Sequence, residues 1–98
     1  GFDCVAERHL DIQENFTFAH IPPDDIRKMV REVAASKPQA ITIFCTNLCG
    51  APLAAELEEE LGIPIYDTVS TVVWKSLQLA GVDTSRLSGW GSIFKENF

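Results

Sequence analysis

The sequence has no excess of positive charge. Its 98 residues include 8 Lys and Arg against 14 Asp and Glu, which gives a formal net charge of −6. Nucleic-acid phosphates and anionic membrane surfaces are bound by clustered Lys and Arg side chains, so no nucleic acid and no membrane is expected as a partner. No apolar run is long enough to span a bilayer as a helix.

The sequence also lacks the spaced ligands of common metal and redox sites. Its three cysteines, Cys4, Cys45 and Cys49, include no Cys-x-x-Cys pair, which argues against a zinc ribbon and a thioredoxin-type site. His9 and His20 have no matching ligand cluster, so no metal is expected. No glycine-rich phosphate-binding motif is present, so no nucleotide is expected. An odd number of cysteines without a dense framework is typical of reduced thiols, which predicts a cytoplasmic protein.

Strand and helix patterns alternate along a chain that is 46% apolar and long enough for one domain. The chain opens directly on Gly1-Phe2-Asp3, which is typical of a fragment of a longer protein, with a short natural protein as the alternative. In chain order we expect a strand over 3–7, a loop over 10–21, a helix that starts at 22–25 and ends at 36–38, a strand over 40–45, a loop over 46–50, a helix ended by Gly62, a strand over 63–66, a helix over 68–80 and a tail over 82–98.

The apolar spacing predicts which side of each helix is buried. The residues expected to point inward are Ile26, Met29, Val30 and Val33 in the first helix, Leu53, Leu57 and Leu61 in the second, and Val69, Val73 and Leu77 in the third. The acidic residues 58–60 are expected to be solvated, and the apolar strand over 40–45 is typical of a strand covered on both faces. The alternation predicts an α/β fold with a parallel sheet, in which ligands bind beyond the carboxyl ends of the strands.

Cys45 lies where such a ligand is expected, because it ends the strongest strand and a short loop follows it. Free N–H groups in the loop over 46–50 would hold an anion and favour a thiolate. A buried, inert cysteine is the alternative, and a redox pair with Cys49 is a lesser one. Tyr66 and Asp67 end the next strand and could reach the same crevice; otherwise Tyr66 is core and Asp67 caps the following helix.

Four segments together carry a family resemblance. They are Phe44-Cys45-Thr46-Asn47-Leu48, the stretch over 57–67, the stretch over 74–81 and Gly89-Trp90-Gly91-Ser92-Ile93-Phe94. In this order they resemble the second half of the Asp/Glu racemase superfamily, in its arylmalonate decarboxylase and maleate isomerase branch. The resemblance implies the second half of a two-lobe fold, here a flavodoxin-like three-layer lobe with a short parallel sheet. Residues 1–81 would form this lobe, and the tail over 82–98 would pack on the missing first lobe and be exposed without it.

The resemblance also implies a chemistry. Cys45 matches the second-lobe cysteine, which would donate a proton to an enediolate intermediate, and Thr46 and Asn47 match residues that bind a substrate carboxylate. It implies a racemase- or decarboxylase-type enzyme that needs no cofactor and acts on a small carboxylic or dicarboxylic acid. The expected partners are that acid and the missing N-terminal lobe or a second copy, so a homo-oligomer is expected. The alternatives are a maleate-type cis–trans isomerase with Cys45 as nucleophile or acid, and a non-catalytic α/β binding or interaction domain.

Overall fold

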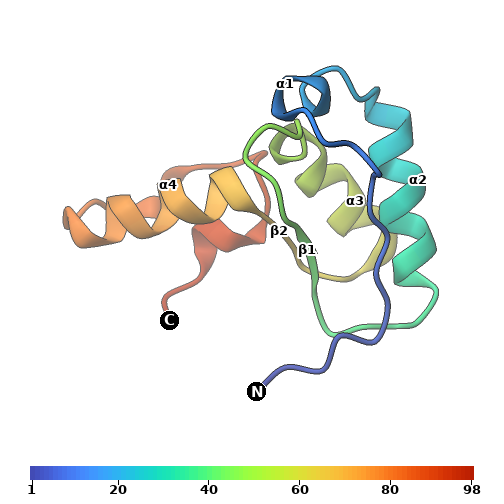
Figure 1. Cartoon of the computed structure of the whole chain (residues 1–98). Helices are drawn as coiled ribbons and strands as arrows, with labels where there is room; N and C mark the ends of the chain where they lie inside the picture. The colour runs from blue at the N-terminus through green and yellow to red at the C-terminus, as the bar shows by residue number, and fades with distance from the viewer.

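The computed structural model describes residues 1–98 and shows an α/β fold with a short parallel sheet (Figure 1). The elements are α1 (Asn15–Phe18), α2 (Pro23–Ala34), β1 (Ile41–Ile43), α3 (Ala54–Leu61), β2 (Ile65–Asp67) and α4 (Thr68–Leu79), with single 3₁₀ turns at Ala51–Leu53, Thr84–Arg86 and Ser92–Lys95. In the sheet Ile41 lies beside Ile65 and Ile43 beside Asp67. The predicted alternation and the parallel sheet are therefore confirmed. None of the helices has the length and apolar character needed to cross a bilayer.

The main core lies between the sheet and the helices α2 and α3. It consists of Ile26, Val30, Ile41, Ile43, Leu53, Ala54, Leu57 and Ile65. Proline in the first turn and two acids beside it begin α2 as predicted, and Ile26 and Val30 point inward as the spacing predicts. Gly62 ends α3 in the left-handed conformation, at φ 68°, which a residue with a Cβ adopts only at a cost.

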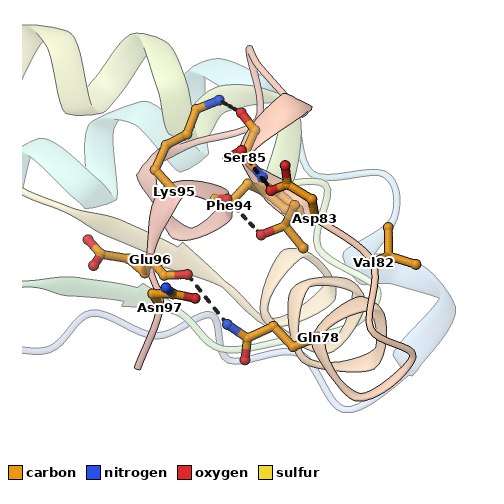
Figure 2. Close-up of a pocket in the computed structure, with 9 residues that line it drawn as sticks. Gln78, Val82, Asp83, Ser85, Phe94, Lys95, Glu96 and Asn97 are labelled. Atoms are coloured by element: carbon orange, nitrogen blue, oxygen red, sulfur yellow. Dashed lines mark hydrogen bonds between the residues drawn. The ribbon is translucent and has the colours of Figure 1, made fainter.

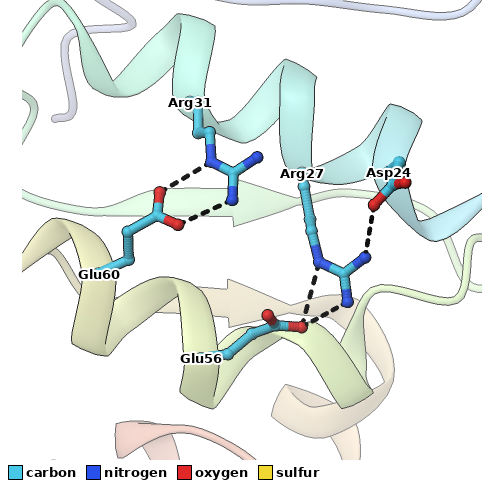
Figure 3. A network of polar contacts seen from close by, with 5 residues as sticks. All are labelled: Asp24, Arg27, Arg31, Glu56 and Glu60. Carbon is cyan, nitrogen blue, oxygen red and sulfur yellow. Dashed lines mark hydrogen bonds and ion pairs between the residues drawn. The ribbon is translucent and has the colours of Figure 1, made fainter.

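Two arginines of α2 reach across to α3 (Figure 3). Arg31 donates to both carboxylate oxygens of Glu60, at 2.8 and 2.7 Å. Arg27 donates to Glu56 and also to Asp24. The hydrogen bond from Arg31 lowers the pKa of Glu60 below its usual value. The two helices are therefore held together by charge on the solvent side of their apolar contact.

The Glu60–Arg31 pair predicts a pH-dependent contribution to stability. Because the pKa of Glu60 is lowered in the folded chain, the contribution is present above the carboxyl's unfolded pKa and is lost as the pH falls through the folded one. Glu60→Gln is expected to lower the urea midpoint slightly at pH 7, and this difference should vanish as the solution is acidified. Glu59→Gln, which changes an exposed neighbour without an ion pair, is the control and should show no such trend.

Residues 3–7, predicted as a strand, form none, and Val5 is exposed. A strand needs a partner for its N–H and C=O groups, and β1 pairs only with β2. The predicted loop over 10–21 contains the single helical turn α1. These corrections leave the segment before α2 outside the hydrogen-bonded pairing of the sheet.

The face of the sheet opposite α2 and α3 is open, which corrects the prediction that β1 is covered on both sides. Ile41 and Ile43 are buried, but Thr42 is exposed and Phe44 is 91% exposed. The strands are also placed differently: β1 ends at Ile43 and β2 covers Ile65–Asp67. The sequence does not distinguish a strand covered on both faces from one covered on a single face when the outward residue is as apolar as Phe44.

The buried side of α4 differs from the predicted one. Val69 and Val73, expected inward, are 41% and 42% exposed, whereas Ser70 and Trp74 are buried. The reason is the partner of the helix: Figure 1 shows α4 extending away from the α2–α3 layer. Its Trp74 packs on Ile93 and Phe94 of the tail, with Tyr66 of β2 against the same cluster.

The tail folds back onto this lobe, contrary to the expectation that its apolar residues are all exposed. Ile93 and Phe94 are buried against Trp74, although Trp90 and Phe98 remain exposed. The tail is fixed by Glu58, whose carboxylate accepts hydrogen bonds from the N–H and the hydroxyl of Ser92 and from the N–H of Ile65. Glu58 was expected to be solvated; it is instead the side chain that joins α3, β2 and the tail.

Loss of the Glu58 carboxylate is expected to release the tail. Glu58→Ala leaves the N–H groups of Ile65 and Ser92 without their acceptor, which should lower the free energy of unfolding by about 1–3 kcal/mol. Trp74 should become more solvent-exposed, which shifts its fluorescence to longer wavelength. Glu59→Ala removes the adjacent, exposed carboxylate and serves as the matched control. Equal spectra and equal stability for both variants would contradict this role.

Candidate functional site

Cys45 lies just beyond the carboxyl end of β1, outside the strand and half-buried. The loop over 46–50 follows it and leads into the 3₁₀ turn at Ala51–Leu53 and then into α3. This is the predicted order of strand, cysteine, loop and helical turn, with the turn beginning at Ala51 as expected. All three cysteines are free thiols, and Cys4 and Cys49 are exposed. The sulfur of Cys45 is thus neither mid-strand nor fully enclosed by the core.

The loop after Cys45 offers unused hydrogen-bond donors. No N–H group from Thr46 to Cys49 donates to a carbonyl of the chain, and only the N–H of Gly50 is used, by the carbonyl of Leu48. N–H groups that make no hydrogen bond within the chain are available to an anion. The side chain of Thr46 is exposed. The Asn47 amide donates to the carbonyl of Asn15 at 3.3 Å, which ties the loop to α1.

Asp67 ends β2 beside Ile43 and is completely buried. Its Oδ2 accepts from the N–H groups of Val69 and Ser70 at 2.8 and 3.1 Å, so it caps α4, one of the two roles predicted for it. Its Oδ1 has no hydrogen-bond partner. Burial raises the pKa of Asp67, and the two capping N–H groups oppose this shift.

Gly50 brings the end of the Cys45 loop against Asp67. A Cβ at Gly50 would lie 2.8 Å from Cγ2 of Ile43 and 2.9 Å from Oδ1 of Asp67, so the close approach requires glycine. Thr68, which follows Asp67, also links α4 to the end of β1, because its hydroxyl donates to the carbonyl of Ile43 at 2.9 Å. This contact between Gly50 and Asp67 was not predicted, since nothing in the local sequence pattern links the two loops.

Tyr66 belongs to a different surface. It is half-buried, packs on the cluster of Trp74, and burial raises the pKa of its phenol. It lines an apolar groove of about 370 Å³ over the open face of the sheet. The other lining residues are Thr42, Phe44, Thr68, Thr71, Val72, Trp74, Ile93 and Phe98. Cys45 is not among them, so the structure does not bring Tyr66 and the thiol into one crevice.

A second hollow, of about 260 Å³, lies between the end of α4 and the tail (Figure 2). Its contacts are structural: Gln78 donates to the carbonyl of Glu96, Lys95 to the carbonyl of Ser85, and Thr84 to the carbonyl of Phe94. No group of three or more His, Cys, Asp or Glu side chains is placed to hold a metal ion. Cys45 and its loop therefore remain the part of the molecule with groups best suited to react with a ligand or to bind one.

The arylmalonate decarboxylase family model matches residues 1–94. The chain belongs to this family. Among solved structures, this arylmalonate decarboxylase-family chain matches a cysteine-to-serine mutant of Nocardia farcinica maleate cis–trans isomerase with a covalently bound succinylcysteine intermediate, with a TM-score of 0.83 and 21% identity. The match covers 93% of this chain and 37% of the isomerase chain. No curated protein sequence matches significantly.

The family match and the structural match both fall within the Asp/Glu racemase superfamily, so the resemblance found in the sequence is confirmed. This member of the arylmalonate decarboxylase family is related to enzymes of the racemase, decarboxylase and isomerase types. It spans little more than a third of the isomerase chain that it matches.

Proposed function

We propose that the chain is the second lobe of a cofactor-independent racemase- or decarboxylase-type enzyme that acts on a small carboxylic or dicarboxylic acid. The observation that carries the proposal is the free cysteine beyond the end of β1, followed by a loop whose N–H groups from Thr46 to Cys49 donate to no carbonyl of the chain. The thiol supplies a proton and the loop supplies donors for a carboxylate, which are the two groups that proton transfer beside a carboxylate needs.

In the decarboxylation of a malonate-type acid, the bond between the central carbon and one carboxylate breaks and carbon dioxide leaves. The electron pair stays on the substrate as an enediolate, whose negative charge is stabilised by hydrogen bonds from the backbone of Thr46 and Asn47. The thiol of Cys45 then transfers its proton to the central carbon, and the resulting thiolate regains a proton from solvent. Thr46 adds a hydroxyl, whereas the Asn47 amide steadies the loop through the carbonyl of Asn15.

A maleate-type cis–trans isomerase is the second candidate. It is favoured by the structural match, because the matched isomerase carries a covalently bound succinylcysteine. In this reaction the Cys45 thiolate would add to one alkene carbon while the other gains a proton. Rotation about the new single bond, followed by loss of the proton and the thiolate, would give the trans acid.

The partners expected from the sequence extend the proposal. Phe98 and Trp90 stay exposed in the tail, and we propose that they face the missing first lobe or the equivalent surface of a second copy. Such a partner would close the site over Cys45. The cytoplasmic location remains a prediction from the reduced thiols alone.

Thiol reactivity tests the proposal directly. A half-buried thiol should react more slowly with iodoacetamide than exposed ones, so faster alkylation of Cys45 than of Cys4 and Cys49 would show chemical activation. We expect Cys45 to be modified about tenfold faster than either, with protection by malonate or maleate but not by neutral malonamide. Peptide mass spectrometry over a time course gives the three rates. Alkylation in the order of exposure, without protection, would instead favour a non-catalytic binding domain.

A further inference from the structure

The Oδ1 atom of Asp67 is a buried acceptor without a partner. The side chain is 0% exposed, and only its Oδ2 is used, by the N-terminus of α4. A buried polar atom that makes no hydrogen bond destabilises the fold. The capping of α4 uses one carboxylate oxygen and does not require the second. Serine caps a helix about as well as aspartate and carries no second oxygen.

The unpaired oxygen lies against the loop that follows Cys45. Asp67 is the neighbour of Ile43 in the sheet, and Oδ1 is 2.9 Å from the point where a Cβ on Gly50 would lie. Thr68, the next residue, donates to the carbonyl of Ile43. The junction between β2 and α4 therefore supports the base of the loop whose outer N–H groups are free.

We propose that Asp67 is a proton-linked positioning residue, which takes up one proton when the Cys45 loop binds a carboxylate. The inference rests on the proposed function, because the carboxylate is the ligand assigned there to the loop. A carboxylate on the loop and an ionised carboxylate buried next to the base of the loop repel each other, and this repulsion raises the pKa of the buried carboxyl and favours its protonated form. The proton comes from solvent and binds Oδ1, and no bond of the substrate breaks in this step.

The surroundings of Asp67 leave it sensitive to a charge on the loop. Burial raises its pKa, the N–H groups of Ser70 and Val69 oppose this, and no charged side chain contributes. On the elements around it, the titratable groups are the thiols of Cys45 and Cys49 on the loop, the phenol of Tyr66 in β2, the carboxylates of α3 and the amine of Lys75 in α4. In α3, Glu56 and Glu60 pair with Arg27 and Arg31 and Glu59 is exposed, as Lys75 is in α4. The carboxylate of Glu58 accepts hydrogen bonds from Ser92 and from the N–H of Ile65. None of these groups contributes to the raised pKa of Asp67, so an anion on the loop would add a charge effect that the unliganded chain lacks.

A covalent anion tests this without relying on substrate affinity. In a chain carrying Cys4→Ser and Cys49→Ser, iodoacetate places a carboxymethyl group on Cys45, and iodoacetamide places a neutral group of nearly the same shape. The carboxyl ¹³C resonance of Asp67 is then followed against pH in both forms. We expect the midpoint of Asp67 to be higher in the carboxymethyl form by about half a pH unit or more. The exposed capping residue Asp83 should have the same midpoint in both forms. Equal midpoints for Asp67 would overturn the proposal.

Binding of a permanently charged anion gives the second measurement. Methanedisulfonate keeps both negative charges across the pH range, so any pH dependence of its affinity comes from the titration of groups in the protein. Its Kd should rise about threefold or more as Asp67 ionises, whereas Asp67→Asn, which retains the cap, should bind it equally at every pH. A pH-dependent Kd that persists in Asp67→Asn would overturn the role of Asp67. Absence of binding at any pH, together with a shifted Asp67 midpoint in the carboxymethyl form, would count against the proposed function and still support the coupling.

Discussion

Leu57→Ala is expected to destabilise the chain more than any other single truncation of a core side chain. Leu57 is 1% exposed and lies in the cluster shared by α2, α3 and the sheet. Truncation of a leucine in such a position lowers the free energy of unfolding by about 3 kcal/mol, because apolar burial is lost and a cavity is left behind. A domain of this size has only about 5 kcal/mol of stability at the lower end of the usual range, so about 2 kcal/mol would remain and the midpoint of thermal unfolding should fall by roughly 10–25 °C.

Thermal and urea unfolding, followed by far-ultraviolet circular dichroism, would measure this loss. Leu79→Ala is the matched control, because Leu79 also lies in a helix and is 79% exposed. Its effect should stay within about 0.5 kcal/mol. Similar losses for the two variants would mean that the core does not lie between α3 and the sheet.

Residues 1–98 alone are expected to show no turnover of small malonates or of maleate. The Cys45 loop is open to solvent, since Thr46 and Cys49 are exposed. Stabilisation of an enediolate depends on preorganised donors in a site from which water is excluded. In the single lobe, the site is closed on one side and open to water on the other. It therefore has the thiol and the N–H groups but lacks surroundings of low dielectric constant, and its rate should be about a thousandfold or more below that of a closed site.

The measurement combines proton exchange and decarboxylation assays with light scattering on the same sample. Exposed apolar residues such as Phe44, Val72 and Phe98 favour self-association, so the size of the active species decides the interpretation. Turnover by a strictly monomeric chain would refute the half-site model. Turnover that appears only in an oligomer and disappears in Cys45→Ala would show that a second copy replaces the missing lobe.

Local signals in the sequence predicted the elements and the position of Cys45 well. Proline and acids at the start of α2, the glycine after α3 and the apolar strand before Cys45 each act over a few residues. Their geometry is determined by neighbouring φ and ψ angles and by the first hydrogen-bonded turn. The family resemblance supplied the role that we propose for the cysteine, which no local pattern specifies.

The errors arose where distant residues decide the outcome. The prediction that Glu58 is solvated is wrong because its partner Ser92 lies 34 positions away. The predicted inward face of α4 is wrong because Trp74 packs on Ile93 of the tail, a contact that the spacing within the helix does not indicate. The contact between Gly50 and Asp67 joins two loops that follow neighbouring strands, and it becomes visible only when the register of the sheet is known.

The division of the apolar residues into two clusters has a consequence for cooperativity. The cluster around Leu57 involves α2, α3 and the sheet, whereas the cluster of Trp74, Ile93 and Phe94 joins α4 to the tail, and the two have no buried residue in common. Glu58 is the side chain that bridges them through hydrogen bonds. Local opening of α4 and the tail therefore leaves the α2–α3 layer intact. The same opening would also remove the N–H groups of Val69 and Ser70 from Asp67, so the support of the Cys45 loop is linked to the folding of α4.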